Sequence, residues 1–429
     1  MATRGSNEAR GDSRLRDLVQ HAERALSSGR RDEAKRLLAQ AKALEPNHPL
    51  VLNAEGVQEL HGGDSVVARR LFERAIESDA GNPSFWVNLA TSLRRVGSQD
   101  EELSALEKAL ALEPRHLFAL LQKAGLLQLQ GKMRAAAIVY QNALATIPAG
   151  AQLPENLRPA IEKAVSAIKD NNAALEAFLT DKVAALRAQY SGEDLSRFDH
   201  CLDTLVAKRK IYVPRPTFLA FPKVPAYEFY PRKDFPWLDE IEAASAEIRA
   251  EFERAHLEDS ERLEPYIHYP QGVPLDQWAE LNHSKRWSVF YLWRDGRRVE
   301  EAIARCPRTA ELFERVPQLD IPDTGPTCFF SILAPHSRIP PHSGVTNARL
   351  IVHVPLVVPP ACRYRVGSEM REWKFGEAFV FDDSIEHEAW NDSDLPRAVL
   401  IFDIWNPYLT LAERDLVRAT VAGHQEYNR

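Results

Sequence analysis

Two histidines have the residue type and the surroundings to bind a metal ion. His342 lies in the segment PPHSG, directly before an apolar run typical of a strand, and His387 follows 45 residues later in FDDSIEHEAWN. A single histidine of this kind is more often a polar turn residue, but two neutral imidazoles on facing strands can share one metal ion. The usual non-haem iron site adds a carboxylate to two histidines. That carboxylate normally lies two residues after the first histidine, where this chain has Gly344.

Short strands must position these histidines. After about Trp287, turn sequences such as RDG and NDSD separate runs rich in β-branched and aromatic residues, namely WSVFYLW, TCFFSIL, ARLIVHVPLVV, CRYRV, EAFVF and RAVLIFDIW. Several short strands at this spacing predict a sandwich or a jelly-roll barrel. We expect a cupin-like double-stranded β-helix with flanking helices, in which a strand end and a later strand face each other across the barrel mouth.

A 34-residue period occupies the N-terminal third of the chain. Three residue types recur on this step: the glycines Gly29, Gly63, Gly97 and Gly131, the alanines Ala41, Ala75, Ala109 and Ala143, and the large apolar residues Leu38, Phe72, Leu106 and Tyr140. The glycine is typical of a turn between two helices, and the alanine lets neighbouring helices approach closely. Prolines at positions 46, 114 and 148 are expected to end the second helix of a unit. The pattern resembles tetratricopeptide repeats.

The chain therefore divides into three predicted parts. An all-α tetratricopeptide-repeat solenoid with four units of 34 residues spans 14–150, capping and linker helices span 151–209, and the barrel domain spans 210–415. Repeat arrays of this kind form a concave surface that usually binds a peptide or another protein. A spacer or a dimer interface is the alternative role for the repeats.

Composition narrows the classes of function. The formal net charge is −7, which argues against nucleic-acid binding as the main activity. The first residues, MATRGSNEARGDSRLR, have no apolar core of the signal-peptide kind, and no stretch approaches the roughly 20 apolar residues of a membrane span. Four scattered cysteines without CxxC spacing indicate reduced thiols. We expect a cytoplasmic protein.

Three motifs resemble those of the aspartyl/asparaginyl β-hydroxylases: HSGVTNARLIVHVPL, WKFGEAFVFDDSIEHEAWN and RAVLIFDIWNP. The resemblance covers about residues 210–410. The members of this family are oxygenases that depend on Fe(II) and 2-oxoglutarate and use O2. They bind iron with two histidines only and have glycine where the carboxylate ligand would be. The resemblance implies that His342 and His387 are the iron ligands.

The same motifs imply roles for five further residues. Arg397 and Ser331 match the groups that bind the distal carboxylate of 2-oxoglutarate, a role that suits the planar guanidinium fork. His353 matches a polar contact near the metal-bound end of the cosubstrate, and Trp287 matches an aromatic wall of the pocket. Arg349 matches a basic residue near the substrate acid. Serine and tryptophan on strands are also common core residues.

Some of these residues have a second interpretation. Asp382 and Asp383 are consistent with a turn cap. Alternatively, Asp383 accepts a hydrogen bond from iron-bound water and so compensates for the missing ligand. His353 in an apolar strand is consistent with a core histidine whose polar atoms are satisfied, and Arg397 with an ordinary surface or salt-bridged arginine.

The predicted function is hydroxylation of an aspartyl, asparaginyl or similar residue in a peptide or protein held by the repeats. Animal members of the family read RLR where this chain reads Arg349-Leu350-Ile351, so their specificity for Asp or Asn in epidermal-growth-factor-like domains does not transfer directly. Relatives of this domain hydroxylate lipid acyl chains, which makes a lipid or a small amino acid an alternative substrate. A catalytically inactive repeat-barrel binding module is the non-enzymatic alternative.

Overall fold

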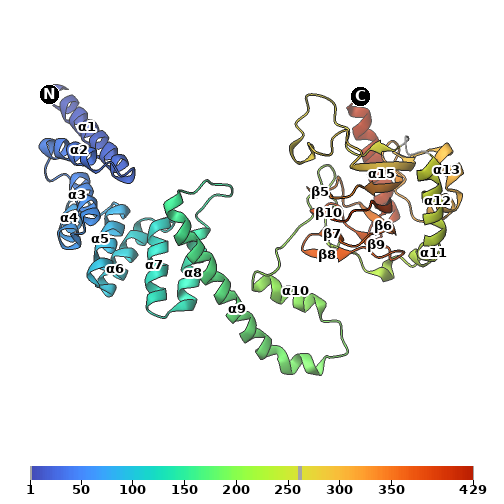
Figure 1. The fold of residues 1–429 in the computed structure, drawn as a ribbon, viewed down its shortest axis with the longest axis horizontal. Helices are drawn as coiled ribbons and strands as arrows, with labels where there is room; N and C mark the ends of the chain where they lie inside the picture. The colour runs from blue at the N-terminus through green and yellow to red at the C-terminus, as the bar shows by residue number, and fades with distance from the viewer. Residues whose placement is uncertain (1, 259–262, 429) are drawn as a thin grey trace. The chain divides into compact units, whose positions relative to one another are not determined.

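The computed structural model describes residues 2–258 and 263–428 (Figure 1). The chain forms two compact units, Met1–Leu202 and Asp203–Arg429. The first unit is helical and the second contains the sheets, so the predicted fold class is confirmed.

The first unit is built from pairs of helices that follow one another along the chain. Their bounds are α1 Ala2–Ser27, α2 Arg31–Leu44, α3 Pro49–Gly62, α4 Ser65–Ser78, α5 Pro83–Val96, α6 Gln99–Leu112, α7 Leu117–Leu129 and α8 Met133–Leu144. The four glycines of the 34-residue period lie between the two helices of each pair and all have positive φ, between 74° and 96°. Glycine adopts this left-handed conformation without steric cost, and the helix therefore ends there.

Small residues set the spacing between helices of the repeat unit. The four periodic alanines have no exposed surface, and the large apolar residues on the same step are buried. Position 56 on α3 has no room for a side chain, because a Cβ atom on Gly56 would lie 2.5 Å from Cε1 of Phe72 on α4. Helix α4 ends at Ser78 although position 80 is alanine, so this helix ends without the proline that the other three units have at the same step.

Helix α9 (Arg158–Gln189) follows the last repeat and packs against α8 through its N-terminal half, as the predicted capping helix should. Ala164 is its buried residue, and Ile161 and Ile168 lie against the same cluster. Helix α10 (Ser196–Leu205) comes next. No helix in the described parts of the chain has both the length and the apolar character that a membrane crossing requires.

Two antiparallel sheets form the core of the second unit. The major sheet has seven strands, in the order β1-β2-β4-β11-β6-β9 with β3 beside β2, and the minor sheet has four, in the order β5-β10-β7-β8. The major strands are β1 Glu264–Pro265, β2 Trp287–Arg294, β3 Arg297–Arg298, β4 Cys328–Leu333, β6 Arg349–Val357, β9 Phe379–Phe381 and β11 Arg397–Trp405. The minor strands are β5 Ser337–His342, β7 Cys362–Val366, β8 Glu369–Glu372 and β10 His387–Asn391.

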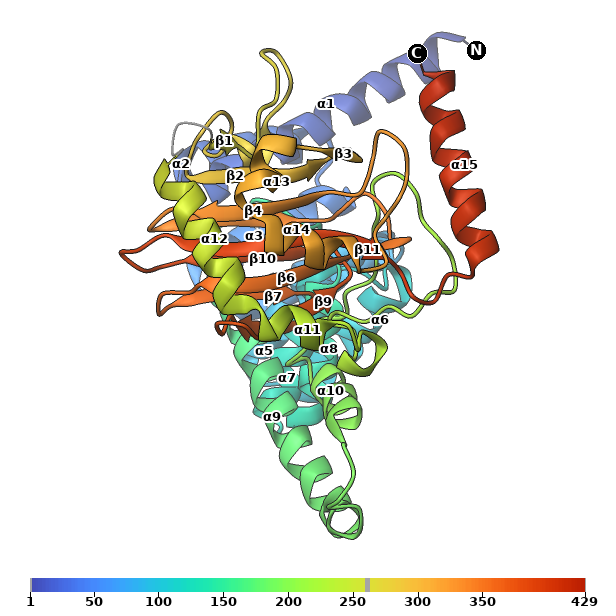
Figure 2. The ribbon, with the colours of Figure 1, turned by 90° about the vertical axis from the view of Figure 1, so that its right-hand side faces the viewer.

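The two faces of the major sheet have different neighbours. Helices pack on its outer face through a large apolar cluster, and Figure 2 shows α12 and α14 in front of the strands. These helices are α11 Leu238–Ala243, α12 Ser245–Glu258, α13 Glu300–Arg305 and α14 Pro307–Glu314, and α15 Leu411–Tyr427 follows the last strand. A second cluster lies between the two sheets. Because side chains alternate along a strand, every second residue of β4, β6 and β11 faces the space between the sheets.

The sequence patterns did not predict strands β5 and β10, which carry the two histidines. Strand β5 contains Pro340 and Pro341, which cannot donate backbone hydrogen bonds. It lies at the edge of the minor sheet, where proline is tolerated because one side of the strand needs no partner. Strand β10 mixes Glu388 and Asn391 with apolar residues and so lacks a clear strand pattern.

Candidate functional site

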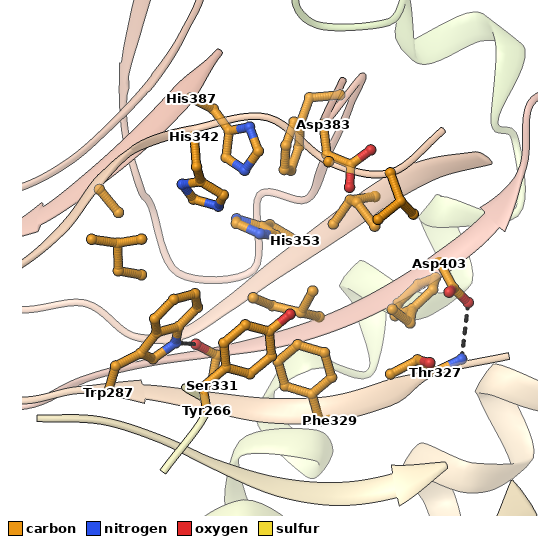
Figure 3. Close-up of a pocket in the computed structure, with 18 of the residues that line it drawn as sticks. Tyr266, Trp287, Thr327, Phe329, Ser331, His342, His353, Asp383, His387 and Asp403 are labelled. Carbon is orange, nitrogen blue, oxygen red and sulfur yellow. Dashed lines mark hydrogen bonds between the residues drawn. The ribbon is translucent and has the colours of Figure 1, made fainter. Parts of the chain in front are cut away.

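A pocket of about 400 Å³ opens between the two sheets. Its lining includes all eight residues that the sequence analysis selected, namely Trp287, Ser331, His342, Arg349, His353, Asp383, His387 and Arg397. Figure 3 shows the three histidines close together, with Trp287 and Ser331 on the opposite wall.

The paired strands β5 and β10 bring the two candidate metal ligands together. His342 is the last residue of β5 and His387 the first of β10, and the two are direct partners in the antiparallel register. Their ring centroids are 4.0 Å apart. Nδ1 of His342 lies 2.8 Å from the carbonyl oxygen of Pro340, and Nδ1 of His387 lies 3.0 Å from that of Ile385. If each Nδ1–H donates to its carbonyl, each Nε2 keeps its lone pair for a metal.

Burial favours the neutral form of both imidazoles. It lowers the pKa of His342 to about 3, with a further contribution from His387, and it lowers the pKa of His387 to about 4. A neutral imidazole is the form that binds a metal ion. The two rings therefore fit the role of paired metal ligands.

Gly344 and Asp383 occupy the place where a third ligand would be expected. A Cβ atom on Gly344 would lie 2.1 Å from Oδ2 of Asp383, so the carboxylate of Asp383 fills the space that a side chain at position 344 would need. Oδ1 of Asp383 is buried without a hydrogen-bond partner. Among the residues that the structure describes, no group of three or more His, Cys, Asp or Glu side chains is arranged to hold a metal ion.

Arg397 is a buried cation in the lining of the pocket. Its exposed fraction is 1%, and no carboxylate forms an ion pair with it among the side chains that the structure describes. Burial lowers its pKa to about 10, so the guanidinium is still charged at neutral pH. It lies over the ring of Trp373 at 4.6 Å, and its Nη1 donates to the carbonyl oxygen of Ser331 at 3.4 Å. The alternative of an ordinary surface or salt-bridged arginine therefore does not hold.

Trp287 and Ser331 are linked across neighbouring strands. Nε1 of Trp287 on β2 donates a hydrogen bond to Oγ of Ser331 on β4 at 3.0 Å (Figure 3). Because this bond uses a lone pair of Oγ, the hydroxyl hydrogen of Ser331 remains available for another acceptor.

His353 lies among aromatic rings on the inner face of β6. Tyr364, Phe379 and Phe381 surround it with ring centroids 4.9–5.3 Å away. Its Nδ1 is buried without a hydrogen-bond partner, and burial holds its pKa well below the usual range. It is therefore not a core histidine with both nitrogens satisfied.

Arg349 lies between two buried carboxylates. Its Nη2 is 3.0 Å from Oδ2 of Asp383, and its Nη1 is 3.4 Å from Oδ2 of Asp403 on β11. Burial lowers the pKa of Arg349, but the two carboxylates outweigh it and the net shift is upward. The neighbouring Asp382 has the turn-cap role, because its Oδ1 accepts hydrogen bonds from the backbone and hydroxyl of Ser384.

Sequence reasoning missed several residues of the pocket. Tyr266 and Trp278 come from segments outside the recognised motifs, and the rings of Tyr266 and Trp287 are 4.1 Å apart. Asp403 was detectable, because it lies six residues after Arg397 on the same strand and alternation places both on one face. Trp373, in the segment WKFGEAF, had no periodic signal.

The family comparison matches the region that contains this pocket. The family described as aspartyl/asparaginyl beta-hydroxylase matches residues 242–407. The aspartyl/asparaginyl beta-hydroxylase of Homo sapiens is 38% identical over 145 residues, which are 34% of this chain and 19% of that protein. The ornithine lipid ester-linked acyl 2-hydroxylase of Rhizobium tropici is 35% identical over 181 residues, which are 42% of this chain and 60% of that protein. The chain thus spans less than two thirds of either relative.

Solved structures with helical repeats also show a weak similarity to this chain. A thermophilic tetratricopeptide-repeat protein of Thermus thermophilus has a TM-score of 0.32 at 20% identity, and the match covers 42% of this chain and 97% of that one. Such scores are low, and the repeat assignment depends on the 34-residue period and the helix pairs themselves. Residues 242–407, which contain the histidine pair, Arg349 and Arg397, thus match the aspartyl/asparaginyl β-hydroxylase family, and the resemblance seen in the sequence motifs is confirmed over this region.

Proposed function

We propose that the second unit is an Fe(II)- and 2-oxoglutarate-dependent hydroxylase that acts on an aspartyl, asparaginyl or similar side chain of a peptide or protein. One observation carries this proposal: two neutral imidazoles and a buried guanidinium without a carboxylate partner, in the described chain, line the same pocket. His342 and His387 would hold the iron. Iron and 2-oxoglutarate, when bound, would supply the oxidising chemistry that turns a C–H bond and O2 into an alcohol, with succinate and CO2 as co-products.

Arg397 and Ser331 would bind the distal carboxylate of 2-oxoglutarate. A buried cation without an anion is costly, and a ligand carboxylate would offset that cost. Trp287 orients the Ser331 hydroxyl so that its hydrogen is free to donate. His353 lies on the same inner face as Arg397 and would contribute its unpartnered Nδ1 to the other end of the cosubstrate.

Asp383 would accept a hydrogen bond from a water molecule in the coordination sphere of the metal. Its unpartnered Oδ1 supports this role, and so does its position in the space beside Gly344. The adjacent aromatic side chains would exclude bulk water from the reacting carbon. Tyr266 stacks near Trp287, and the ring of Trp278 is 5.0 Å from that of His342.

The repeats would bind the chain that flanks the target residue. Tetratricopeptide arrays present an extended concave surface of the kind that holds peptides. A lipid acyl chain is the second candidate substrate, because the Rhizobium tropici relative has an acyl 2-hydroxylase name and matches over 181 residues.

The metal and cosubstrate parts of this proposal can be tested together. The purified chain of 429 residues should bind 2-oxoglutarate in calorimetry only when Fe(II), or Mn(II) as an inert substitute, is present. Both His342→Ala and His387→Ala should abolish this metal-dependent binding. His336→Ala is the matched control, because that histidine is exposed and pairs with Asp394 outside the pocket lining. Undiminished binding by both pocket variants would refute the site assignment.

A further inference from the structure

Few full charges line the substrate side of the pocket. In the described lining, the guanidinium groups are those of Arg349 and Arg397, and the carboxylates are those of Asp295, Asp383 and Asp403. The proposed function uses Arg397 for the cosubstrate. Arg349 is then the cation left to receive a charged substrate.

Arg349 already forms ion pairs with two carboxylates, those of Asp383 and Asp403. Asp383 and Asp403 contact different Nη atoms of the guanidinium, at 3.0 Å and 3.4 Å, and their side chains are 8% and 2% exposed. Burial raises the pKa of Asp403 to about 6, which leaves this group ionised at pH 7.5. The cluster therefore has one positive and two negative charges. A substrate carboxylate would meet net negative charge, or would displace a buried carboxylate from its ion pair with Arg349, and both are unfavourable.

Aliphatic and aromatic side chains make up much of the remaining lining. Ile351 lies two residues before His353 on the same inner face of β6, and it packs against the cluster between the sheets. Across the pocket, Tyr266, Trp278 and Trp287 form a run of neighbouring rings, with centroids 4.1 Å and 6.2 Å apart. These walls can contact a carbon chain or the face of an amide, and none of them provides a second cation.

We infer that the substrate side chain that enters this subsite is uncharged, such as an asparagine carboxamide or an aliphatic chain, and is not an aspartate carboxylate. The inference rests on the proposed function and names the substrate class of that site. A carboxamide has no net charge to conflict with Asp383 and Asp403, and its donor and acceptor atoms suit a cluster that contains both kinds of group.

Matched peptide pools provide the test. Three pools have randomised flanks and differ only in a fixed central residue, which is Asp, Asn or Leu. Each pool is incubated with the chain of 429 residues, Fe(II), 2-oxoglutarate and ascorbate at neutral pH. Tandem mass spectrometry then locates any added oxygen on the central residue. We expect the Asn or Leu pool to gain at least about tenfold more product than the Asp pool, which corresponds to about 1.4 kcal/mol.

Equal or greater product from the Asp pool would overturn the inference. So would product from none of the pools, because the inference names a peptide side chain. Calorimetric binding of 2-oxoglutarate to the Mn(II)-loaded protein, without any peptide, separates these outcomes from failure of the proposed function. If that binding is present, the oxygenase site stands and only the substrate class is wrong.

A charge variant makes the test sharper. Ile351→Arg adds a cation on the inner face of β6 and should move the product ratio toward the Asp pool by about tenfold. Ile211→Arg is the matched control, because residue 211 is 72% exposed and lies outside the pocket lining, so the ratio should stay as in the parent protein. If Ile351→Arg does not fold, Asp403→Asn removes one of the two opposing charges and should shift the ratio in the same direction. An unchanged ratio in a folded variant contradicts the electrostatic argument.

Discussion

At the scale of single residues, the pocket holds two arginines in opposite electrostatic states. Arg397 is buried without a carboxylate, within the described chain, whereas Arg349 has two. Burial of an unpaired charge destabilises a fold, and proteins retain such a group where a ligand completes it. The proposed function assigns a ligand carboxylate to Arg397. Arg349, in contrast, already forms ion pairs with Asp383 and Asp403.

Replacing Arg397 should therefore separate stability from binding. Arg397→Met keeps a long side chain over Trp373 but removes the buried charge, so we expect the free energy of unfolding to rise by about 1–3 kcal/mol without ligands. Binding of 2-oxoglutarate should be lost. Denaturant unfolding followed by tryptophan fluorescence reports on this unit, since Trp86 is the only one of the eight tryptophans in residues 1–202.

The control for that experiment is Arg363→Met, because Arg363 is half exposed and pairs with Asp392. This substitution should change neither the free energy of unfolding nor the free energy of 2-oxoglutarate binding by more than about 0.5 kcal/mol. A large loss of stability in Arg397→Met would mean that the guanidinium has a structural partner.

Asp403 should make stability depend on pH. Burial raises its pKa from 3.8 to about 6 in the folded protein, although Arg349 opposes the shift. A raised carboxyl pKa stabilises the fold at pH values below the unfolded pKa, and this contribution is lost as the pH rises through the folded pKa. Relative to that of Asp403→Asn, the free energy of unfolding of the parent protein should fall by on the order of 3 kcal/mol between about pH 4 and pH 7.

Unfolding in urea at a series of pH values measures this difference. Asp415→Asn, which removes an exposed carboxylate on α15, should follow the parent curve. If the parent protein and Asp403→Asn run parallel across this range, Asp403 has an ordinary pKa in the folded state.

At the scale of elements, the close approach of paired helices defines the repeat unit. Helices α3 and α4 meet where Gly56 faces the ring of the fully buried Phe72. Strands β5 and β10 have a comparable role in the second unit, since their register makes His342 and His387 direct partners. In both units, the contact between one pair of elements determines where the side chains lie: Phe72 in the first unit, and the two histidines in the second.

Gly56→Ala should disturb the α3–α4 pair. The new Cβ would lie within 3 Å of three atoms of the Phe72 ring, so one helix must move, and we expect a loss of about 1–3 kcal/mol. Gly62→Ala on the same helix has open space around it and should be neutral or gain up to about 1 kcal/mol. Thermal unfolding followed by far-ultraviolet circular dichroism compares them. Equal melting temperatures would show that the close contact is unimportant.

At the scale of the whole molecule, the chain joins two units with separate cores. The apolar clusters of the repeats contain residues of the first unit, and both sheet clusters contain residues of the second. A unit with its own core can fold by itself. The pocket residues all belong to the second unit, so metal and cosubstrate binding should not require the repeats.

We therefore expect the second unit to bind the metal and the cosubstrate without the first unit, and the first unit to contribute to substrate binding. Residues 203–429 alone should bind 2-oxoglutarate with Mn(II) as tightly as the full chain does. In contrast, kcat/KM for a peptide substrate should fall by about tenfold or more once the repeats are removed. Calorimetry and product mass measure the two quantities. An unchanged kcat/KM would mean that the repeats do not hold the substrate.

The sequence by itself determined the repeat array, the family motifs and eight of the residues that line the pocket, but not Tyr266, Trp278, Trp373 or Asp403. The 34-residue period was readable because each helix pair contacts its neighbours in the chain. Roles taken from the motifs, including the metal and cosubstrate ligands, remain predictions.

Only the tertiary structure decided which charges meet and where the histidines lie. Arg349 pairs with carboxylates 34 and 54 residues away, on segments whose register no local pattern encodes, and Arg397 has none among the described residues. Strand β5 contains two prolines and is recognisable only as the edge of a finished sheet. Strand periodicity predicts the face on which a side chain lies, but the partner on that face depends on pairing between distant segments.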